Sequence, residues 1–365
     1  MRSECDYVQW LMNVPGVGYL RCQKLLESYG SAEAVWEASE SDLKERAVVE
    51  NKIVQKIVSS RPTYSFLEQE NFLKRHGIRV IHISDPDYPF LLQQIYDPPH
   101  ILYVKGEFPP PDESRTMAVV GSRNPTNYGI MIANKLASQL AEQHITIVSG
   151  MARGIDMIAH EAALQTGTKT IAVLAGGILK AYPAYNHSLA ERISRQGALI
   201  SEFHPLATAH PGMFPIRNRI ISGISRGVLV VEAARRSGSL ITANHGLEQN
   251  REVFSVPGPI TSPLSLGTND LIRQGARLIT GIDDIWEEFP DWKTNTCHIR
   301  TTPPEQLTLE ERLVLESIGY GAAHLDQLLR VSQISKGELH RLLIEMEIKG
   351  YIKQMPGQLY MRAFV

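Results

Sequence analysis

The stretch FPIRNRIISGISRGVLVVEAARRSGSLITA, residues 214–243, concentrates side chains that can bind an anion. It holds a single acidic residue and five arginines, which are Arg217, Arg219, Arg226, Arg235 and Arg236. A guanidinium presents several N–H donors in a planar fork that fits the oxygens of a phosphate. Arginines also serve as ordinary solvated surface, so this stretch alone leaves the ligand open.

Small residues, hydroxyls and further cations follow several short apolar runs, such as MAVVG, ITIVS, TIAVL and GVLVVEA, that we expect to be strands. Ligands bind outside the carboxyl ends of the strands in an open parallel sheet, so these loops should share one edge. An ordinary strand-to-helix turn with a serine cap would explain residues 237–239 equally well in isolation. Taken together, the loops predict a phosphate-binding edge that contains Ser122, Arg123, Gly150, Arg153, Gly176, Lys180, Phe214, Arg217, Asn218, Arg219, Ser237, Gly238 and Ser239.

The chain lacks the signatures of common nucleotide chemistry. Residues 150–154, GMARG, do not match GxGxxG, and GxxxxGK[ST] is absent, so neither NAD nor P-loop ATP binding is supported. Asp156, His160, Glu202 and Glu232 are the candidate acids and bases. We expect structural roles for Asp156 and His160, and an ion pair between Glu232 and the nearby arginines. We therefore expect no catalytic residue, no cofactor and no metal.

Without a catalytic or cofactor site, the function that these residues favour is binding of single-stranded nucleic acid. Such a binding surface combines a positive groove with aromatic faces for the bases. Phe214, Tyr182 and Tyr185 fall near the same predicted edge. The alternative is that these aromatic residues belong to the core. Phe214 precedes Pro215 and the arginines, and it is our candidate for base stacking.

Regular alternation of apolar runs and amphipathic stretches predicts the architecture of residues 76–290. Continuous apolar strands separated by helices indicate a parallel sheet covered on both faces. We therefore predict an α/β fold, a doubly wound, Rossmann-like parallel sheet.

Two smaller domains should flank this sheet. Residues 1–75 read as a helical domain of the SAM or helix-hairpin-helix type, with the hairpin turn at Pro15-Gly16-Val17-Gly18. Its glycines could admit a phosphate, but the acidic surroundings favour a packing role. After a polar linker at 291–306, capping boxes at 308–311 and 335–338 open helices of a winged-helix domain at 307–365.

Charge is distributed unevenly along the chain, which has a net charge of −2. Residues 1–114 hold 12 Lys and Arg against 17 Asp and Glu, residues 115–275 hold 15 against 9, and residues 276–365 hold 10 against 13. A basic middle third is typical of a domain that binds a polyanion. The three cysteines lack ligand spacing, and we expect a cytoplasmic protein because no signal peptide or membrane span is evident.

Several segments resemble the DprA/Smf family of DNA-processing proteins. They are VVGSRNPTNYG, VSGMARGIDMIAHEAAL, YPAYN, ISEFHP, the stretch at 214–243, VFSVPGPI and GTNDLIRQGA, and together they cover about residues 115–280. The chain departs from the family at Leu179, where an aspartate is common, and at Asn250, where a glycine is usual. The flanking helical and winged-helix modules also fit known family architectures.

The resemblance implies a non-enzymatic protein that binds incoming single-stranded DNA in natural transformation, protects it and loads the RecA recombinase. It also implies a homodimer formed through the Rossmann-like domain. Carried over by motif, the contacts to the DNA backbone and the pocket wall are Gly121, Ser122, Arg123, Phe214, Arg217, Asn218, Arg219, Ser237, Gly238 and Ser239. Arg217 and Arg219 are expected to point into the pocket. Arg226 and Arg236 are expected to lie in solvent.

Two alternatives remain open at this point. Nucleotide-phosphate N-glycosidases of the LOG type bind nucleoside monophosphates on a similar sheet, although their PGGxGTxxE signature is missing here. A regulatory protein that reads duplex DNA through its winged helix is a weaker alternative. The predicted recognition helix at 335–350 balances three cations against three acids, which favours protein contacts over the major groove.

Overall fold

The fold is described from a computed structural model that covers residues 2–46, 48–108, 115–180, 187–293, 308–318, 323–332, 334–349, 351–355 and 357–362. It divides into two compact units, Met1–Thr294 and Asn295–Val365. Tyr182, Tyr185 and most of the predicted linker lie outside the described residues. The boundary predicted between residues 75 and 76 stays a prediction, because both sides belong to the first unit.

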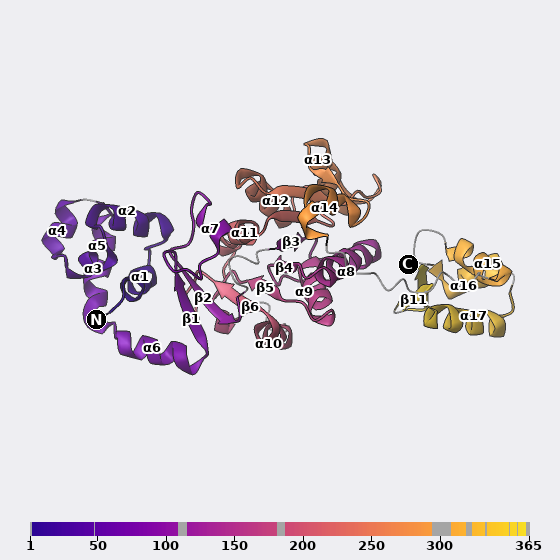
Figure 1. The fold of residues 1–365 in the computed structure, drawn as a ribbon, viewed down its shortest axis with the longest axis horizontal. Coiled ribbons are helices and arrows are strands. Elements are labelled where there is room, and N and C mark those ends of the chain that lie inside the picture. Colours follow the sequence, from indigo (N-terminus) through magenta and orange to yellow (C-terminus); the bar gives the residue numbers. More distant parts are fainter. Residues whose placement is uncertain are drawn as a thin grey trace. The chain divides into compact units, whose positions relative to one another are not determined.

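Nine strands of the described first unit form one sheet in the order β1-β2-β6-β5-β4-β3-β7-β8-β9 (Figure 1). β1 and β2 pair antiparallel with each other, and β2 pairs antiparallel with β6, whereas the pairs from β6 to β9 are parallel. The strands are β1 (Ile78–His82), β2 (Ile101–Gly106), β3 (Thr116–Val120), β4 (Thr146–Ser149), β5 (Thr170–Val173), β6 (Ala198–Ser201), β7 (Gly227–Val230), β8 (Glu252–Ser255) and β9 (Arg277–Leu278). The prediction of an α/β fold with a parallel sheet is confirmed from β6 to β9, whereas β1 and β2 add an antiparallel edge that was not predicted.

Helices cover both faces of this sheet, as its continuous apolar strands require. Every residue of β3 is buried. On one face α8 (Asn127–Glu142) and α9 (Ile155–Gln165) pack against Met117, Val119 and their neighbours. On the other face α11 (Met213–Ile224) and α12 (Gly238–Glu248) pack against Ala118, Val120 and theirs (Figure 1). The other described α-helices of the first unit after β1 are α7 (Phe90–Gln93), α10 (His187–Gln196), α13 (Leu266–Arg273) and α14 (Asp283–Glu288).

The N-terminal region is helical, as predicted, and shares its core with the sheet. Its helices are α1 (Glu4–Asn13), α2 (Tyr19–Tyr29), α3 (Ala32–Glu37), α4 (Glu40–Glu45), α5 (Asn51–Ser60) and α6 (Phe66–Arg75). One continuous cluster of buried residues joins Trp10 and Leu25 of these helices to Tyr103 of β2 and Ile193 of α10. The helical region is therefore fixed to the antiparallel edge of the sheet.

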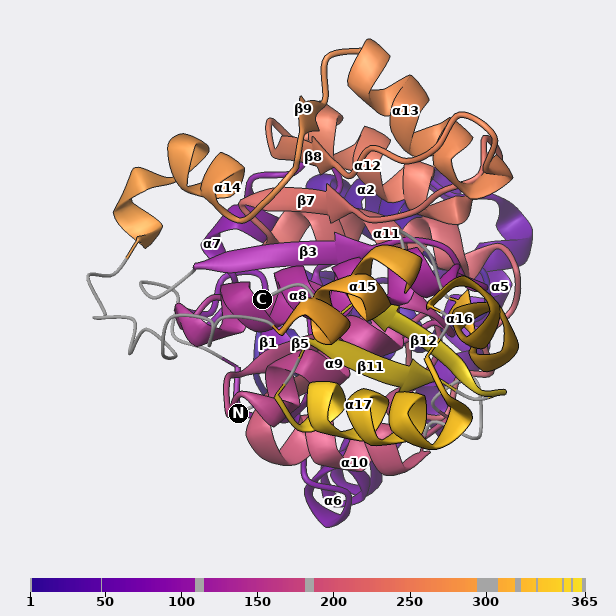
Figure 2. The same ribbon diagram turned by 90° about the vertical axis from the view of Figure 1, so that its right-hand side faces the viewer.

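The second unit is a winged helix (Figure 2). It contains α15 (Leu309–Ile318), α16 (Leu325–Ser332) and α17 (Lys336–Ile348), and a sheet in the order β10-β12-β11, where β10 is Ala323–His324, β11 is Ile352–Met355 and β12 is Leu359–Arg362. Thr308 and Glu311 form the predicted capping box, because each backbone N–H donates to the other side chain. On α17, Arg341 pairs with both Glu338 and Glu345.

Among the described helices, none is both long and apolar enough to cross a membrane.

Candidate nucleic-acid interface

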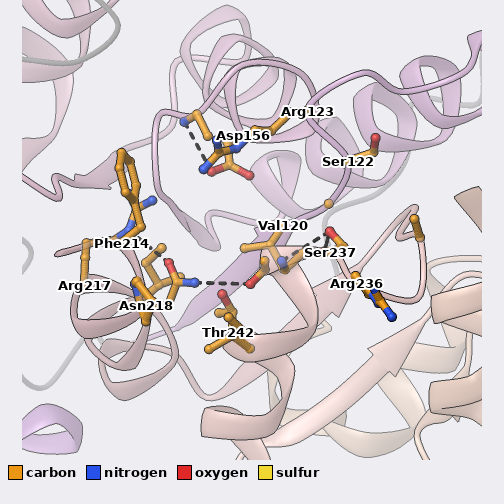
Figure 3. Close-up of a pocket in the computed structure, with 18 of the residues that line it drawn as sticks. Val120, Ser122, Arg123, Asp156, Phe214, Arg217, Asn218, Arg236, Ser237 and Thr242 are labelled. Carbon is orange, nitrogen blue, oxygen red and sulfur yellow. Dashed lines mark hydrogen bonds between the residues drawn. The ribbon is translucent and has the colours of Figure 1, made fainter. Parts of the chain in front are cut away.

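A groove of about 780 Å³ opens where the order of the strands reverses. The chain leaves β3 toward β4 on one side and returns to β7 on the other, so the loops at the carboxyl ends of β3 and β7 diverge. Such a switch point is the usual ligand site of a doubly wound sheet. Figure 3 shows Phe214, Arg217 and Asn218 on one wall and Ser237 and Arg236 on the other.

Most of the predicted edge residues line this groove. They are Ser122 and Arg123 after β3, Phe214, Arg217 and Asn218 on α11, and Ser237, Gly238 and Ser239 at the start of α12, together with Gly121. Gly150, Arg153, Gly176, Lys180 and Arg219 do not line it. The geometry therefore brings together the loops after β3 and β7 with Ala152 of the loop after β4, and it leaves out the loop after β5.

The loop after β3 presents an exposed cation. Gly154, with φ of +88°, lies so close to the carbonyl oxygen of Ser122 that a side chain there would overlap it. The Ser122 hydroxyl accepts a hydrogen bond from the Asn124 backbone N–H at 3.1 Å. These contacts fix the conformation of the loop after β3. Arg123 of this loop is exposed and lines the groove.

Phe214 lies beside two guanidinium groups. Its ring centroid is 5.3 Å from Cζ of Arg123 and 6.0 Å from Cζ of Arg217. Both distances suit cation–π attraction, in which the positive charge faces the electron-rich ring. The half-buried ring thus forms an aromatic surface on the groove wall with positive charge next to it.

Arg217 contributes charge from the floor of the groove, but its donors are directed into the protein. Its Nη1 donates to the carbonyl oxygens of Gly150 at 2.5 Å and Val173 at 2.6 Å, and its Nε donates to Asn218 at 3.1 Å. Burial lowers the pKa of Arg217 to about 10, and nearby Asp156 opposes that shift, so the guanidinium is charged at neutral pH. A side chain on Gly150 would overlap this guanidinium, so the glycine provides space for Arg217.

The carboxylate of Asp156 occupies the backbone donors of the loop after β4. It accepts hydrogen bonds from the N–H groups of Gly150 at 3.2 Å and Ala152 at 3.3 Å. Burial raises the pKa of Asp156, whereas Arg217 and these hydrogen bonds lower it. These two backbone N–H groups could have bound a phosphate of a ligand, but they bind the Asp156 carboxyl group instead. Arg153 of the same loop is exposed and does not line the groove.

The start of α12 supplies serine hydroxyls and the positive end of a helix. The Ser237 hydroxyl accepts a hydrogen bond from Ser239 N–H at 3.4 Å and lies 2.7 Å from the Ser239 hydroxyl. Asn218 donates to the Gly238 carbonyl at 3.2 Å and so ties α11 to α12. The first turn of α12 contains no acidic residue, and a helix N-terminus attracts anions.

The prediction for Arg219 is wrong. Arg219 does not point into the pocket but is buried, with Nη2 at 2.5 Å from Glu202 and Nε at 3.1 Å from Asp97. Residues two apart on a helix lie on nearly opposite sides, so Arg219 cannot share the groove with Arg217. The expectation that Arg236 lies in solvent agrees with its exposure, and this arginine also lines the groove.

The prediction for Glu232 is also wrong. Its carboxylate accepts hydrogen bonds from the backbone N–H of Thr126 at 2.9 Å and from the Thr126 hydroxyl at 2.5 Å. Within the described residues it forms no ion pair with an arginine. Its function is to hold the start of α8.

The other predicted residues lie within the fold. His160 is fully buried and its Nδ1 lies 2.7 Å from the Thr170 hydroxyl, and burial lowers the pKa of this imidazole to about 3. Lys180 is exposed, with Nζ 3.4 Å from the Thr208 hydroxyl. Gly176 packs closely against the backbone of residues 207–209. No cluster of three or more His, Cys, Asp or Glu side chains suited to a metal occurs in the described part of the chain.

Some residues of the groove were missed by sequence reasoning. They come from the loop before α11 and from the second turn of α12, and include Ala209, His210, Pro211, Ile241 and Thr242. Thr242 could have been found, because it follows Ser239 by three residues on a helix. The loop residues carry no pattern that points to this edge.

Comparisons with known proteins agree on one family. The family model described as DNA recombination-mediator protein A matches residues 79–290, and the model for the DprA winged helix domain matches residues 299–358. Protein Smf of Synechocystis is 32% identical over 99% of this chain and all of its own length. DNA processing protein DprA of Bacillus subtilis is 44% identical over 60% of this chain and 73% of its own.

Two solved structures are similar as well. The X-ray structure of DprA from Streptococcus pneumoniae has a TM-score of 0.65 at 34% identity and covers 78% of this chain and 97% of its own. A structure of DNA processing protein A from Helicobacter pylori, described as giving insight into its single-stranded DNA binding mode, has a TM-score of 0.52 at 28% identity. It covers 59% of this chain and 96% of its own.

Proposed function

The chain belongs to the DNA recombination-mediator protein A family, and from that premise we propose that it binds single-stranded DNA in the groove between the loops after β3 and β7. The observation that carries the proposal is the convergence of Arg123, Phe214 and the start of α12 on one groove. A relative from Helicobacter pylori is described by its single-stranded DNA binding mode, which supports the same ligand here.

The groove offers contacts to the DNA backbone and a surface for a base. Arg123 and Arg236 are exposed cations, and the serine hydroxyls and the positive end of α12 suit phosphate oxygens. The Phe214 ring suits stacking, which tolerates every base. Because charges, backbone donors and a ring face do not read base edges, binding should be independent of sequence.

We also propose that the protein is not an enzyme. Glu202 is paired with Arg219, Glu232 is held by Thr126, and Asp156 accepts two backbone hydrogen bonds. Each acid that a LOG-type glycosidase mechanism could have used is thus engaged inside the protein. The family resemblance further leads us to propose that the chain acts in the cytoplasm, protects incoming DNA, loads RecA in natural transformation and forms a homodimer through the Rossmann-like domain.

Equilibrium binding of a fluorescent single strand across a salt series tests the DNA site. In Arg123→Ala/Arg236→Ala two exposed groove cations are removed. Each lost phosphate contact should lower the log-log salt slope by about 0.7, so affinity should fall roughly 25-fold at 0.1 M salt. The control Arg226→Ala/Arg235→Ala removes two exposed arginines outside the groove, which pair with Asp291 and Asp270. Equal losses in both variants would move the DNA away from the groove.

A further inference from the structure

A histidine lines the groove together with its arginines. His210 belongs to the loop before α11, and its side chain is exposed. Its backbone carbonyl accepts a hydrogen bond from Met213 N–H at 2.9 Å, so the residue is fixed to the first turn of α11. The ring lies beside Gly212, where an added Cβ would be 3.5 Å from Nδ1 and Cε1. The fold therefore holds an imidazole in the groove.

The imidazole of His210 is not engaged by the protein itself. Neither ring nitrogen forms a hydrogen bond or an ion pair with a residue that the structure describes. Other histidines of the same unit differ, because Nδ1 of His160 lies 2.7 Å from the Thr170 hydroxyl and Nε2 of His204 lies 3.4 Å from Gln69. Both ring nitrogens of His210 are therefore available to a ligand in the groove.

The charged side chains that line the groove with His210 are mostly cationic. They are Arg123 of the loop after β3, Asp156 of α9, Arg217 of α11 and Arg236 of the loop after β7. Asp156 is the one carboxyl group of this described lining. It is buried beside Arg217 and accepts two backbone hydrogen bonds, so its charge is already compensated.

The elements around His210 add further positive charge. Helices α11 and α12 both begin at the groove, and neither has an acidic residue in its first turn. Lys180 Nζ lies 3.4 Å from the hydroxyl of Thr208, two residues before His210. Among these described groups no free carboxylate is placed to neutralise an imidazolium, so a phosphate in the groove is the counter-ion that remains for it.

We propose that His210 binds a phosphate of the single strand in its protonated form, so that DNA binding takes up a proton and strengthens as the pH falls. Histidine is the side chain whose charge changes between about pH 5 and 8. The charged ring donates from both nitrogens, whereas the neutral ring donates from one. A bound phosphate favours the charged ring, so protonation and DNA binding reinforce each other. This inference rests on the proposed function, because it concerns the same groove.

The full-length protein should be tested with oligothymidine that lacks a terminal phosphate, because neither thymine nor an internal phosphate changes its charge where histidine titrates. The affinity of the wild type at about 0.1 M salt should be about 5-fold higher near pH 5.5 than near pH 8, since one phosphate contact is gained. The log-log salt slope should be steeper by about 0.7 at the lower pH.

Three variants separate His210 from other titrating groups. His210→Asn should lose the pH response, whereas His210→Arg should bind tightly at both pH values because its charge is fixed. The matched control is His144→Asn, which removes an exposed histidine just before β4, at the opposite edge of the sheet. His144 has φ of +59°, which asparagine tolerates, so the control should fold normally and keep the pH response.

Calorimetry in two buffers of different ionisation enthalpy, at about pH 6.5, should show proton uptake on binding by the wild type and none by His210→Asn. Wild-type affinity that does not depend on pH would overturn the proposal. So would a pH response that survives in His210→Asn or His210→Arg, or one that is lost equally in His144→Asn. Failure of the groove itself would instead appear as equal losses in Arg123→Ala/Arg236→Ala and its control, so the two failures can be told apart.

Discussion

Replacement of Arg219 by leucine tests whether this arginine belongs to the core or to the DNA site. Its guanidinium is about 5% exposed and contacts Glu202, which is about 6% exposed. Removing one partner of a buried ion pair leaves the other charge without compensation, which typically costs about 3–5 kcal/mol. We expect Arg219→Leu to lower the free energy of unfolding by that amount at neutral pH, measured by urea denaturation.

The pH dependence of this loss follows from Glu202. Burial raises its pKa in the folded protein, and Arg219 opposes that shift, so the pKa should rise further in Arg219→Leu. An acid with a raised pKa binds its proton more tightly in the folded state, and stability therefore falls as pH rises from the unfolded value near 4.3 through the folded pKa. The variant should be less destabilised near pH 4.5 than near pH 8.

Two results would refute this reasoning. One is a loss below about 1 kcal/mol, or a larger loss in acid than at pH 8. The other is a large fall in single-strand affinity in an Arg219→Leu variant that is as stable as the wild type, since this would show that Arg219 contacts the DNA. Arg219→Leu/Glu202→Leu is the control, because replacing both partners of a buried pair by apolar residues often restores stability.

Three other changes have defined outcomes. Gly154→Ala should cost about 2 kcal/mol in thermal unfolding and weaken single-strand binding, because a side chain at φ of +88° would overlap the Ser122 carbonyl and displace the loop; unchanged stability would contradict this. Ser237→Ala should cost about 1 kcal/mol through loss of the α12 cap, as measured by urea denaturation. Glu232→Gln should cost about 1–2 kcal/mol, since one acceptor for Thr126 is lost. Neither it nor the wild type should release a nucleobase from AMP, and release by the wild type alone would revive the glycosidase alternative.

Much of the fold could be predicted because its signals are local. Continuous apolar runs such as β3 can only be buried on both faces, and helical runs between them supply the cover. The carboxyl ends of β3 and β7 then define an edge, so Ser122, Arg123 and residues 237–239 were found from their position after a strand. A local signal also explains Asn250, which stands where the family usually has glycine. Its backbone φ is +55°, in the left-handed region that glycine adopts most easily.

The partners of charged residues could not be predicted in the same way. Arg219 pairs with Asp97 and Glu202, and Glu232 pairs with Thr126, yet these residues are far apart in the chain. Local composition places an acid among arginines and suggests an ion pair, but the direction of a side chain is decided by the helix phase and by tertiary packing.

Helix α11 connects these features. Arg217 and Asn218 face the groove, whereas Arg219 turns to the opposite side, where its Cζ lies 6.0 Å from the ring centroid of Tyr19. Tyr19 begins α2, and the helical region shares its buried core with β2 and α10. Arg219 therefore lies where α11 meets the start of α2, and we expect it to act as a structural contact between them, since it contacts no DNA in our proposal.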